Sequence, residues 1–551
     1  MSTSFRRALT VAVGSLTILA TGPALTVQAG SDQKLSAINH IVVIYEENHS
    51  FDNLYGGWEG VNGRGSLPAQ VDQNGAAYQC LLQNDANLTS PPLSATCNDA
   101  AHSIASHFTN APFSIDQYIP ATARTCPQPG VFNASGLPDS PNNLPGGCTR
   151  DIVHRFYQEQ YQLNNGQQNR YVTGSDAVGL SLGYYDTRAL PVYQYLHSQG
   201  APQYAIADDF FQAAFGGSFL NHQWLIAAAT PTWAGMPASQ RSVLDANGMP
   251  TNYPLYSTPA TKVDKAGTQA CPSSVANRAC GDYAVNTIQP AYQPFKGSPQ
   301  LPPQTGTTIG DELTAAGVSW AWYSGGWSNA DGDVGAPGWT NGTTPGVCAD
   351  ADSIPNPTYP HCPNKVFQYH HQPFNYFASY APGTAGRAHL QDEQGFINAV
   401  NGSGTTCQLN SVSFVKPIGL ENEHPGYTSE TRGSDHLVQL LSSINNSACS
   451  KDTMVVVTYD EFGGQADHVA PPGQGGTPGP HDLWGPGTRI PTLITAPRIR
   501  GNFAVDHTQY DTTSILATIE RRWNLAPLSG RDAAVHDLSN VFNAKQWEAA
   551  S

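Results

Sequence analysis

The sequence predicts an α/β fold built on a central, mostly parallel sheet that helices cover on both faces. Short β-branched runs at 41–45 and 454–459 are typical of strands buried in the middle of such a sheet. Amphipathic helical patterns lie between several such runs, and alternation of strands with helices favours parallel strands joined by helical crossovers. At 551 residues the chain is long enough to bury a large core.

In chain order, the elements follow from where the periodic segments lie. Strands are expected over residues 41–45, 204–207, 318–323, 411–417, 454–459 and 492–495. Helices are expected over 157–163, 190–198, 309–316, 436–444 and 513–523. The intervals 57–143 and 233–307 are rich in Gly, Pro, Asn and Cys, so we expect loop insertions there. Because no long polar linker divides the chain, a single domain is expected over residues 30–551.

The first residues have the pattern of a secretory signal. Two arginines precede an apolar stretch over residues 8–25, and a small-x-small sequence ends at Ala29. Residues 1–29 are therefore expected to be a signal peptide cleaved near Ala29, which would make the protein secreted or periplasmic. A membrane anchor is the alternative, but glycines and a proline interrupt the stretch. No later segment is apolar for long enough to span a bilayer, so stable membrane insertion is not expected.

Cysteine usage and charge describe the same setting. Ten cysteines fit an oxidising compartment, and none shows a CxxC spacing, so structural disulfides are expected. The formal net charge of -16 with 12% charged residues argues against a nucleic-acid partner, because phosphate binding needs a basic face. The expected sequential pairs, which staple the loops, are Cys80 with Cys97, Cys126 with Cys148, Cys271 with Cys280, Cys348 with Cys362 and Cys407 with Cys449.

Two acidic segments follow buried runs at opposite ends of the chain. Glu47 and Asn48 come just after the first run, and Asp460 and Glu461 come directly after the run at 454–459. Ligands of open α/β sheets bind beyond the carboxyl ends of strands, so the two pairs could clamp one divalent ion. Carboxylate and amide oxygens suit Ca²⁺, Mg²⁺ or Mn²⁺, and nearby His and Asp could admit Zn²⁺. A turn or helix cap is the alternative for either pair alone.

Between these segments lies a candidate nucleophile. Ser218 follows two glycines and precedes an apolar stretch that contains His222, which is the pattern of a hydroxyl at a strand-to-helix turn. Helix N-terminal amides would face an incoming anion there. The alternative is an ordinary N-cap serine, because Gly and Ser are common turn formers.

Several histidines stand in polar, punctuated contexts. They could hydrogen-bond the oxygens of a phosphoryl group or protonate its leaving group, since an unperturbed imidazole has a pKa of about 6.5. Any one of them alone could equally be a surface or packing histidine. The candidates are His154, the pair His370 and His371, His424 and His468.

Four segments carry a resemblance to a known family. Residues 47–53 (ENHSFDN) with Gly56 resemble the ENRSFDxxxG signature of the bacterial phosphoesterase family, which contains phospholipases C and acid phosphatases. Residues 459–472 (YDEFGGQADHVAPP) are similar to its DExGGxxDHVxPP segment. Residues 485–491 (GPGTRIP) and 506–514 (DHTQYDTTS) are similar to its closing GxGxRVP and DHxxYDxxS stretches. The matches run in family order over nearly all of the chain after the signal segment.

The resemblance implies an alkaline-phosphatase-like fold and a metal-supported phosphoryl-enzyme mechanism. By matching position, Ser218 would touch the metal and attack phosphorus. His154 matches the His of the HDWxxxHxAWNxG segment, and His424 matches a DHP or EHP motif. His370 or His371 corresponds to a phosphate-facing His of the acid phosphatase branch. The implied metal ligands are Glu47, Asn48, Asp460, Glu461 and Ser218.

Departures from the family pattern favour one branch. Phospholipase C members usually carry Thr at the nucleophile, followed by Pro-Asn-Arg, whereas Ser218 is followed by Phe219. His49 replaces the signature Arg, and the second His of the HDWxxxH motif is absent near Gln160. A secreted acid phosphatase that hydrolyses small phosphomonoesters is therefore the first prediction. The alternatives are a phospholipase C-type phosphodiesterase and a non-catalytic secreted binding protein.

Overall fold

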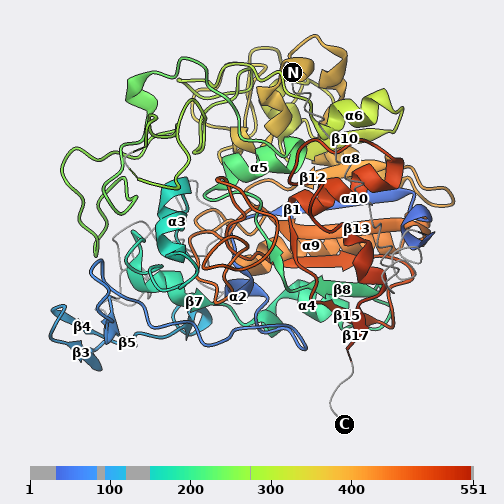
Figure 1. Ribbon diagram of the computed structural model, residues 1–551. Helices are drawn as coiled ribbons and strands as arrows, with labels where there is room; N and C mark the ends of the chain where they lie inside the picture. The colour runs from blue at the N-terminus through green and yellow to red at the C-terminus, as the bar shows by residue number, and fades with distance from the viewer. Residues whose placement is uncertain (1–32, 83–92, 120–148, 274, 548–551) are drawn as a thin grey trace, which may run out of the picture.

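A nine-stranded sheet forms the centre of the computed structural model, with strand order β11-β10-β12-β1-β13-β14-β8-β15-β17. The structure describes residues 33–82, 93–119, 149–273 and 275–547 (Figure 1). The expected signal segment 1–29 and the pair of Cys126 with Cys148 lie outside these ranges. The predicted α/β class with a mostly parallel sheet is confirmed.

The middle of the sheet is parallel. Strand β1 (His40–Glu46) pairs in parallel with β12 (Val412–Lys416) on one side and β13 (Thr453–Tyr459) on the other. Strand β14 runs antiparallel to both of its neighbours, and β17 runs antiparallel to β15. The remaining strands are β10 (Trp320–Ser324), β11 (Leu390–Asp392), β14 (Thr492–Thr495), β8 (Tyr204–Ala207), β15 (Phe503–Asp506) and β17 (Lys545–Gln546).

Two groups of helices sandwich this sheet. One group contains α5 (Ser218–Ala227), α6 (Ile309–Ala315) and α10 (Thr513–Trp523), and α5 contacts both of the others. The other contains α4 (Pro191–Leu196), α8 (Glu393–Asn401) and α9 (Glu430–Asn445). The shorter helices are α2 (Phe51–Leu54) and α7 (Trp327–Asp331), and α3 (Phe156–Leu163) lies to one side of the sheet (Figure 1).

Small two-stranded sheets decorate this core. Their pairs are β9 (Phe210–Phe211) with β16 (Tyr510–Asp511), β2 (Cys80–Leu81) with β5 (Phe108–Thr109), β3 (Cys97–Asp99) with β4 (Ile104–Ser106), and β6 (Phe113–Ser114) with β7 (Gly183–Tyr184). None of the helices within the described ranges is long and apolar enough to cross a membrane.

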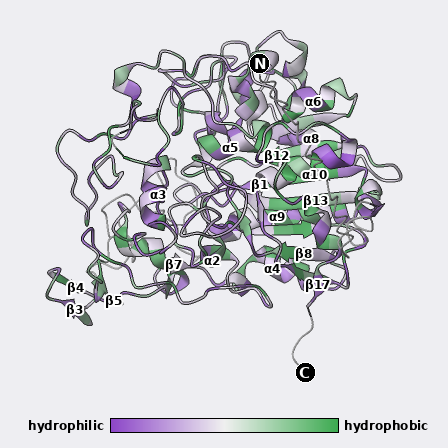
Figure 2. Ribbon diagram, viewed as in Figure 1, coloured by the Kyte–Doolittle hydropathy of each residue, from purple (hydrophilic) through white to green (hydrophobic). Residues whose placement is uncertain are grey.

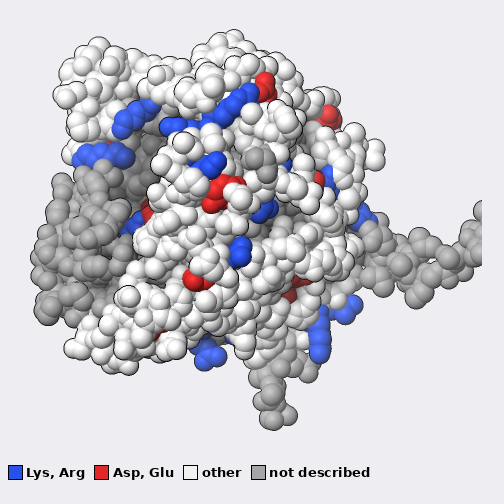
Figure 3. Space-filling view, turned by 60° about the vertical axis from the view of Figure 1, so that its left-hand side comes forward, with Lys and Arg blue, Asp and Glu red and all other residues white. Residues whose placement is uncertain are grey.

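Burial explains why the central strands form. Every residue of β13 and all but the first of β1 are buried, as expected for strands covered on both faces. Figure 2 shows the strands in hydrophobic colours at the centre of the molecule. Fully burying one Val or Ile side chain contributes about 1.5–3 kcal/mol, so these runs anchor the fold. The surface shown in Figure 3 carries few charged side chains on a mostly uncharged background.

Disulfides staple the loops as predicted. The sequential pairs are confirmed for Cys80–Cys97, Cys271–Cys280, Cys348–Cys362 and Cys407–Cys449.

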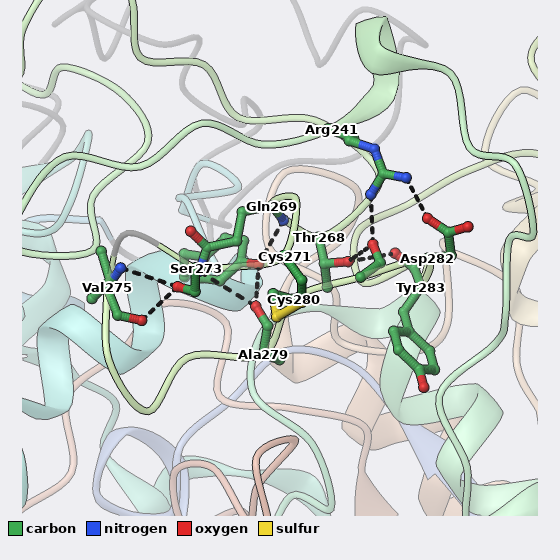
Figure 4. The surroundings of a disulfide bond; sticks show 12 residues. Arg241, Thr268, Gln269, Cys271, Ser273, Val275, Ala279, Cys280, Asp282 and Tyr283 are labelled. Carbon is green, nitrogen blue, oxygen red and sulfur yellow. Dashed lines mark hydrogen bonds and ion pairs between the residues drawn. A yellow bond between two sulfur atoms is a disulfide. The ribbon is translucent and has the colours of Figure 1, made fainter.

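The Cys271–Cys280 loop belongs to the insertion at 233–307 and docks on helix α3. Tyr157 on α3 donates a hydrogen bond to the Ala279 carbonyl at 2.9 Å. Arg241 donates to the Gly281 carbonyl at 2.7 Å and forms an ion pair with Asp282 (Figure 4). These contacts hold the insertion beside α3.

Candidate active site

The sheet register brings the two acidic segments together. Glu46 lies opposite Tyr459 on neighbouring parallel strands, so the residues that follow emerge at the same edge. The Asn48 backbone N–H donates to Asp460 Oδ1 at 3.2 Å. Gly463 has a φ of +62°, and a Cβ there would lie 2.1 Å from the Asn48 carbonyl oxygen, so only glycine permits this approach.

Two glycines allow Ser218 to begin α5 directly above this edge. Gly216 has a φ of +90°, and a Cβ on it would lie 2.6 Å from the Phe156 nitrogen. A Cβ on Gly217 would lie 2.9 Å from the His154 carbonyl oxygen. The two glycines therefore let residues 212–217, the nucleophile loop that leads into Ser218, pass close to the start of α3.

Oxygen atoms from both strand ends surround the Ser218 hydroxyl. Its Oγ lies 3.2 Å from Glu47 Oε2, 3.5 Å from Asn48 Oδ1 and 3.5 Å from Glu461 Oε1. All of these side chains are buried. The structure thus brings together Ser218, Glu47, Asn48, Asp460 and Glu461, the set for which the sequence predicts a metal.

Electrostatics at this edge favour a bound cation. Burial, and then repulsion from Glu47, raises the pKa of Asp460 well above its ordinary value. Burial, and then the Asp460 charge, does the same to the pKa of Glu461. Buried carboxylates that repel one another lower their energy by binding a positive ion, and their hard oxygen atoms suit a divalent metal.

Glu159 on α3 anchors the nucleophile loop, which the sequence reasoning missed. Its carboxylate accepts hydrogen bonds from the Gly216 N–H at 2.5 Å and from the Gln212 side chain at 3.0 Å. The other oxygen accepts from the Thr488 N–H at 2.7 Å and from the Thr488 hydroxyl at 2.8 Å. These four donors tie the loop that precedes Ser218 to the segment after β13.

His154 stands at the wall of a cavity beside Ser218. Its Nε2 lies 3.4 Å from Glu461 Oε1, and its Nδ1 lies 2.6 Å from the Ile152 carbonyl oxygen. The cavity has a volume of about 330 Å³. It is lined by Asp151, Ile152, Val153, His154, Arg155, Asp176, Gly217, Phe219, Asn286 and Thr287.

His424 contacts a predicted metal ligand. Its Nδ1 lies 2.7 Å from the Pro425 carbonyl oxygen, which makes Nδ1 the donor and leaves Nε2 as an acceptor. Asn48 Nδ2 lies 3.0 Å from this Nε2, so the Asn48 amide donates to the imidazole and turns its oxygen toward Ser218. Burial, followed by the charge of His154, holds the pKa of His424 well below its ordinary value.

The two adjacent histidines occupy different positions. His371 Nε2 lies 3.1 Å from Glu47 Oε1, whereas the ring of His370 packs edge-on against His371 at 4.6 Å. Burial, and then the charge of Lys416, lowers the pKa of His370 to about 3 and that of His371 well below its ordinary value. His371 is therefore the member of the pair that reaches the acidic cluster. His468 pairs with Asp52, and its Nδ1 lies 2.6 Å from Asp52 Oδ2.

Two further residues contact the acidic cluster, and the sequence analysis did not assign either of them to it. Lys416, the last residue of β12, places its Nζ 2.6 Å from Glu47 Oε1. His222 lies one helical turn after Ser218, and its Nε2 is 3.9 Å from Glu47 Oε1. The i, i+4 spacing from Ser218 and a lysine at the end of a buried run were the signals that could have revealed them.

A serine at a helix N-terminus beside buried carboxylates is suited to metal-assisted hydrolysis of an ester. The chain belongs to the Phosphoesterase family, whose model matches residues 38–526. It is similar to phospholipase C A of Mycobacterium tuberculosis (strain ATCC 25618 / H37Rv), with 23% identity over 92% of this chain and 78% of that relative. This protein is accordingly a phosphoric ester hydrolase, as predicted.

Other relatives match parts of the chain. Non-hemolytic phospholipase C of Burkholderia pseudomallei (strain K96243) is 27% identical over 43% of this chain and 36% of that relative. Non-specific phospholipase C6 of Arabidopsis thaliana is 30% identical over 23% of this chain and 28% of that relative. A solved structure of an alkaline phosphatase PafA mutant matches 63% of this chain and 95% of that one, with 10% identity and a TM-score of 0.27.

Proposed function

We propose that this protein is an exported, metal-dependent acid phosphatase that hydrolyses small phosphomonoesters through a phosphoserine at Ser218. The observation that carries the proposal is the convergence of three oxygen atoms within 3.2–3.5 Å of the Ser218 hydroxyl. These atoms come from two segments that are more than 400 residues apart in sequence, so the arrangement is built by the whole fold. The four described disulfides support an oxidising compartment.

The donor set fits one divalent ion. Glu47, Asn48, Asp460, Glu461 and the Ser218 hydroxyl would hold it, and their oxygen atoms suit Ca²⁺, Mg²⁺ or Mn²⁺. Such an ion, when bound, favours the serine alkoxide and neutralises charge on the phosphoryl oxygens.

The protein residues then divide the work of the reaction. Ser218 Oγ attacks phosphorus as the bond from phosphorus to the leaving oxygen breaks, and a water molecule later releases phosphate from the serine. His154, whose Nε2 faces the cluster from the cavity wall, is placed to give a proton to the leaving alcohol. His424 fixes the Asn48 amide, and Glu159 fixes the loop before Ser218, so both act as positioning residues.

Two features favour a small, water-soluble substrate. The cavity beside His154 and Gly217 has a volume of about 330 Å³ and polar walls that include Asp151, Asp176 and Asn286. Within the described ranges, the large apolar side chains with high exposure are Val243, Val263, Val334, Val347 and Leu483. A phospholipase needs an apolar surface that accepts acyl chains, and these few side chains provide little of one.

A phospholipase C-type phosphodiesterase is the second candidate. The names of the similar relatives favour it, since they include phospholipases C of Mycobacterium tuberculosis, Burkholderia pseudomallei and Arabidopsis thaliana. Both candidates would use the same nucleophile and metal ligands, so they differ in whether the attacked phosphorus carries one ester group or two.

A paired substrate assay tests the proposal. Release of phosphate from p-nitrophenyl phosphate and of phosphocholine from phosphatidylcholine vesicles is measured with and without added metal. We expect metal-dependent phosphate release and little phosphocholine, with both signals lost in Ser218→Ala. Phosphocholine release that exceeds phosphate release would establish the phospholipase instead. Inactivity of the metal-loaded protein on both substrates would favour a non-catalytic binding protein.

A further inference from the structure

The two carboxylate oxygens of Glu47 face different surroundings. Oε2 lies on the Ser218 side, 3.2 Å from Oγ. Oε1 points the other way, toward three nitrogen atoms: Lys416 Nζ at 2.6 Å, His371 Nε2 at 3.1 Å and His222 Nε2 at 3.9 Å. Glu47 therefore stands between the predicted metal position and a second, nitrogen-rich position.

Lys416 is built into this second position by the sheet. Its side chain has 0% exposure, and its Nζ donates to the Tyr45 carbonyl at 2.7 Å. The Nζ also lies 5.8 Å from the centre of the Tyr45 ring. A lysine is rarely buried without a strong anionic partner, and here Glu47 is that partner.

The imidazole of His222 has the form that binds metal. His222 Nδ1 lies 2.8 Å from the Ser218 carbonyl oxygen, so Nδ1 carries the proton and Nε2 keeps its lone pair. Nε2 of His222 makes no hydrogen bond to any residue that the structure describes, although the side chain has 0% exposure. The rings of His222 and His371 stack at 4.9 Å with an interplanar angle of 4°, so both face the same oxygen.

Together these side chains make a ligand set unlike that of the first position. Glu47, His222 and His371 each offer one atom, and these atoms lie within 4.8 Å of one another. Two imidazole nitrogens and one carboxylate oxygen suit Zn²⁺ better than Ca²⁺ or Mg²⁺. An ammonium 2.6 Å from the shared oxygen repels any divalent ion that enters.

We propose that Lys416 is a fixed cation that fills a second metal position, and that Glu47, His222 and His371 form a latent zinc site which this lysine keeps closed. The native protein then carries one metal ion per chain, with Lys416 supplying the second positive charge. The inference rests on the proposed function in one respect, namely that Glu47 also binds the catalytic ion.

Metal stoichiometry tests the inference directly. Wild type, Lys416→Met, Lys416→Arg and the double variant Lys416→Met/His371→Gln are dialysed against excess zinc and analysed by atomic emission. We expect two zinc ions per chain in Lys416→Met and one in the other three proteins. Lys416→Arg retains the charge, and the double variant removes a ligand, so both are matched controls. Co²⁺ loading adds an independent readout, because new nitrogen ligands in Lys416→Met should intensify the visible absorption.

The outcomes separate this inference from the proposed function. Wild type without bound metal would refute the proposed function, while a zinc ion gained by Lys416→Met would still support the latent site. A folded Lys416→Met variant that binds no more zinc than wild type, or two ions in wild type, would overturn the inference. Circular dichroism checks that each variant is folded. If Lys416→Met does not fold, the wild-type count under excess zinc still decides, since two ions there contradict closure by Lys416.

Discussion

Glu159 should control both stability and catalysis, although it does not contact Ser218. The substitution Glu159→Gln keeps the size of the side chain but replaces one acceptor oxygen with an NH₂ group. Each Glu159 oxygen accepts two hydrogen bonds, one pair from Gly216 and Gln212 and the other from Thr488. Whichever oxygen becomes nitrogen, one buried backbone N–H loses its acceptor: that of Gly216 on one side or that of Thr488 on the other. Gln212 keeps the carbonyls of Ala214 and Gly216 as acceptors.

The magnitude follows from these contacts. A buried donor left without a partner costs about 1–3 kcal/mol, so the stranded backbone N–H should lower the free energy of unfolding by roughly 1–3 kcal/mol. Gly216 lies two residues before Ser218, so relaxation of the loop should also displace the nucleophile. Misplacement of a reacting group by about 1 Å can cost on the order of 100-fold in rate, and we expect kcat to fall by about 10–100-fold.

Urea denaturation followed by circular dichroism gives the stability, and initial rates on a phosphomonoester give kcat. Glu312→Gln is a matched control, because Glu312 is a partly exposed glutamate on α6 and its substitution should change neither quantity. If Glu159→Gln matched wild type within about 0.5 kcal/mol and kept full activity, the anchoring role would be refuted.

Three more outcomes follow from the structure. Removal of metal by chelation should abolish activity. It should also lower the melting temperature, because the buried carboxylates then repel one another. Re-addition of metal should restore both properties, which rate assays and calorimetry measure. His424→Ala should weaken metal binding by about 10–100-fold, because Asn48 loses the partner that orients it. Competition with a chromogenic chelator measures the metal affinity, and an unchanged affinity would contradict the positioning role of His424. Burial lowers the pKa of His436, but the Glu393 carboxylate at 2.8 Å and Glu421 outweigh it and raise the pKa. The imidazolium therefore stabilises the fold fully below about pH 6.5, and this contribution is lost as pH rises through the raised pKa. His436→Gln should reduce the fall in urea midpoint between acidic and alkaline pH, and an unchanged pH profile would contradict this assignment.

The centre of the fold was predictable because its strands are buried on both faces. The run at 454–459 opens with four apolar residues, and the observed strand differs from it by one residue. Edge elements gave no such signal: β17 has two residues, both exposed, and forms only because β15 is available to pair with it. Helix α9 begins at Glu430, where Ser429 caps it by accepting a hydrogen bond from the Arg432 N–H at 3.2 Å. The sequence predicted a start at 436, because the first turns of the helix are polar and lack an apolar pattern.

The candidate site was predictable where its residues follow strand ends. Glu47 and Asp460 are adjacent in space because β1 and β13 are parallel neighbours, which the strand-end rule anticipates. The sequence could not choose between His370 and His371, since that choice depends on how their short helical turn is oriented. Glu159 and Lys416 were missed because a charge inside an amphipathic pattern usually faces solvent, and only the packed fold shows these two to be buried.

The central claim is that Ser218 attacks phosphorus and forms a covalent intermediate. The most direct test is the stereochemistry of phosphoryl transfer from a monoester made chiral with oxygen isotopes to an acceptor alcohol. Two successive in-line displacements, first by Ser218 and then by the acceptor, predict retention of configuration at phosphorus. Inversion would show direct transfer without a phosphoserine and would contradict the account.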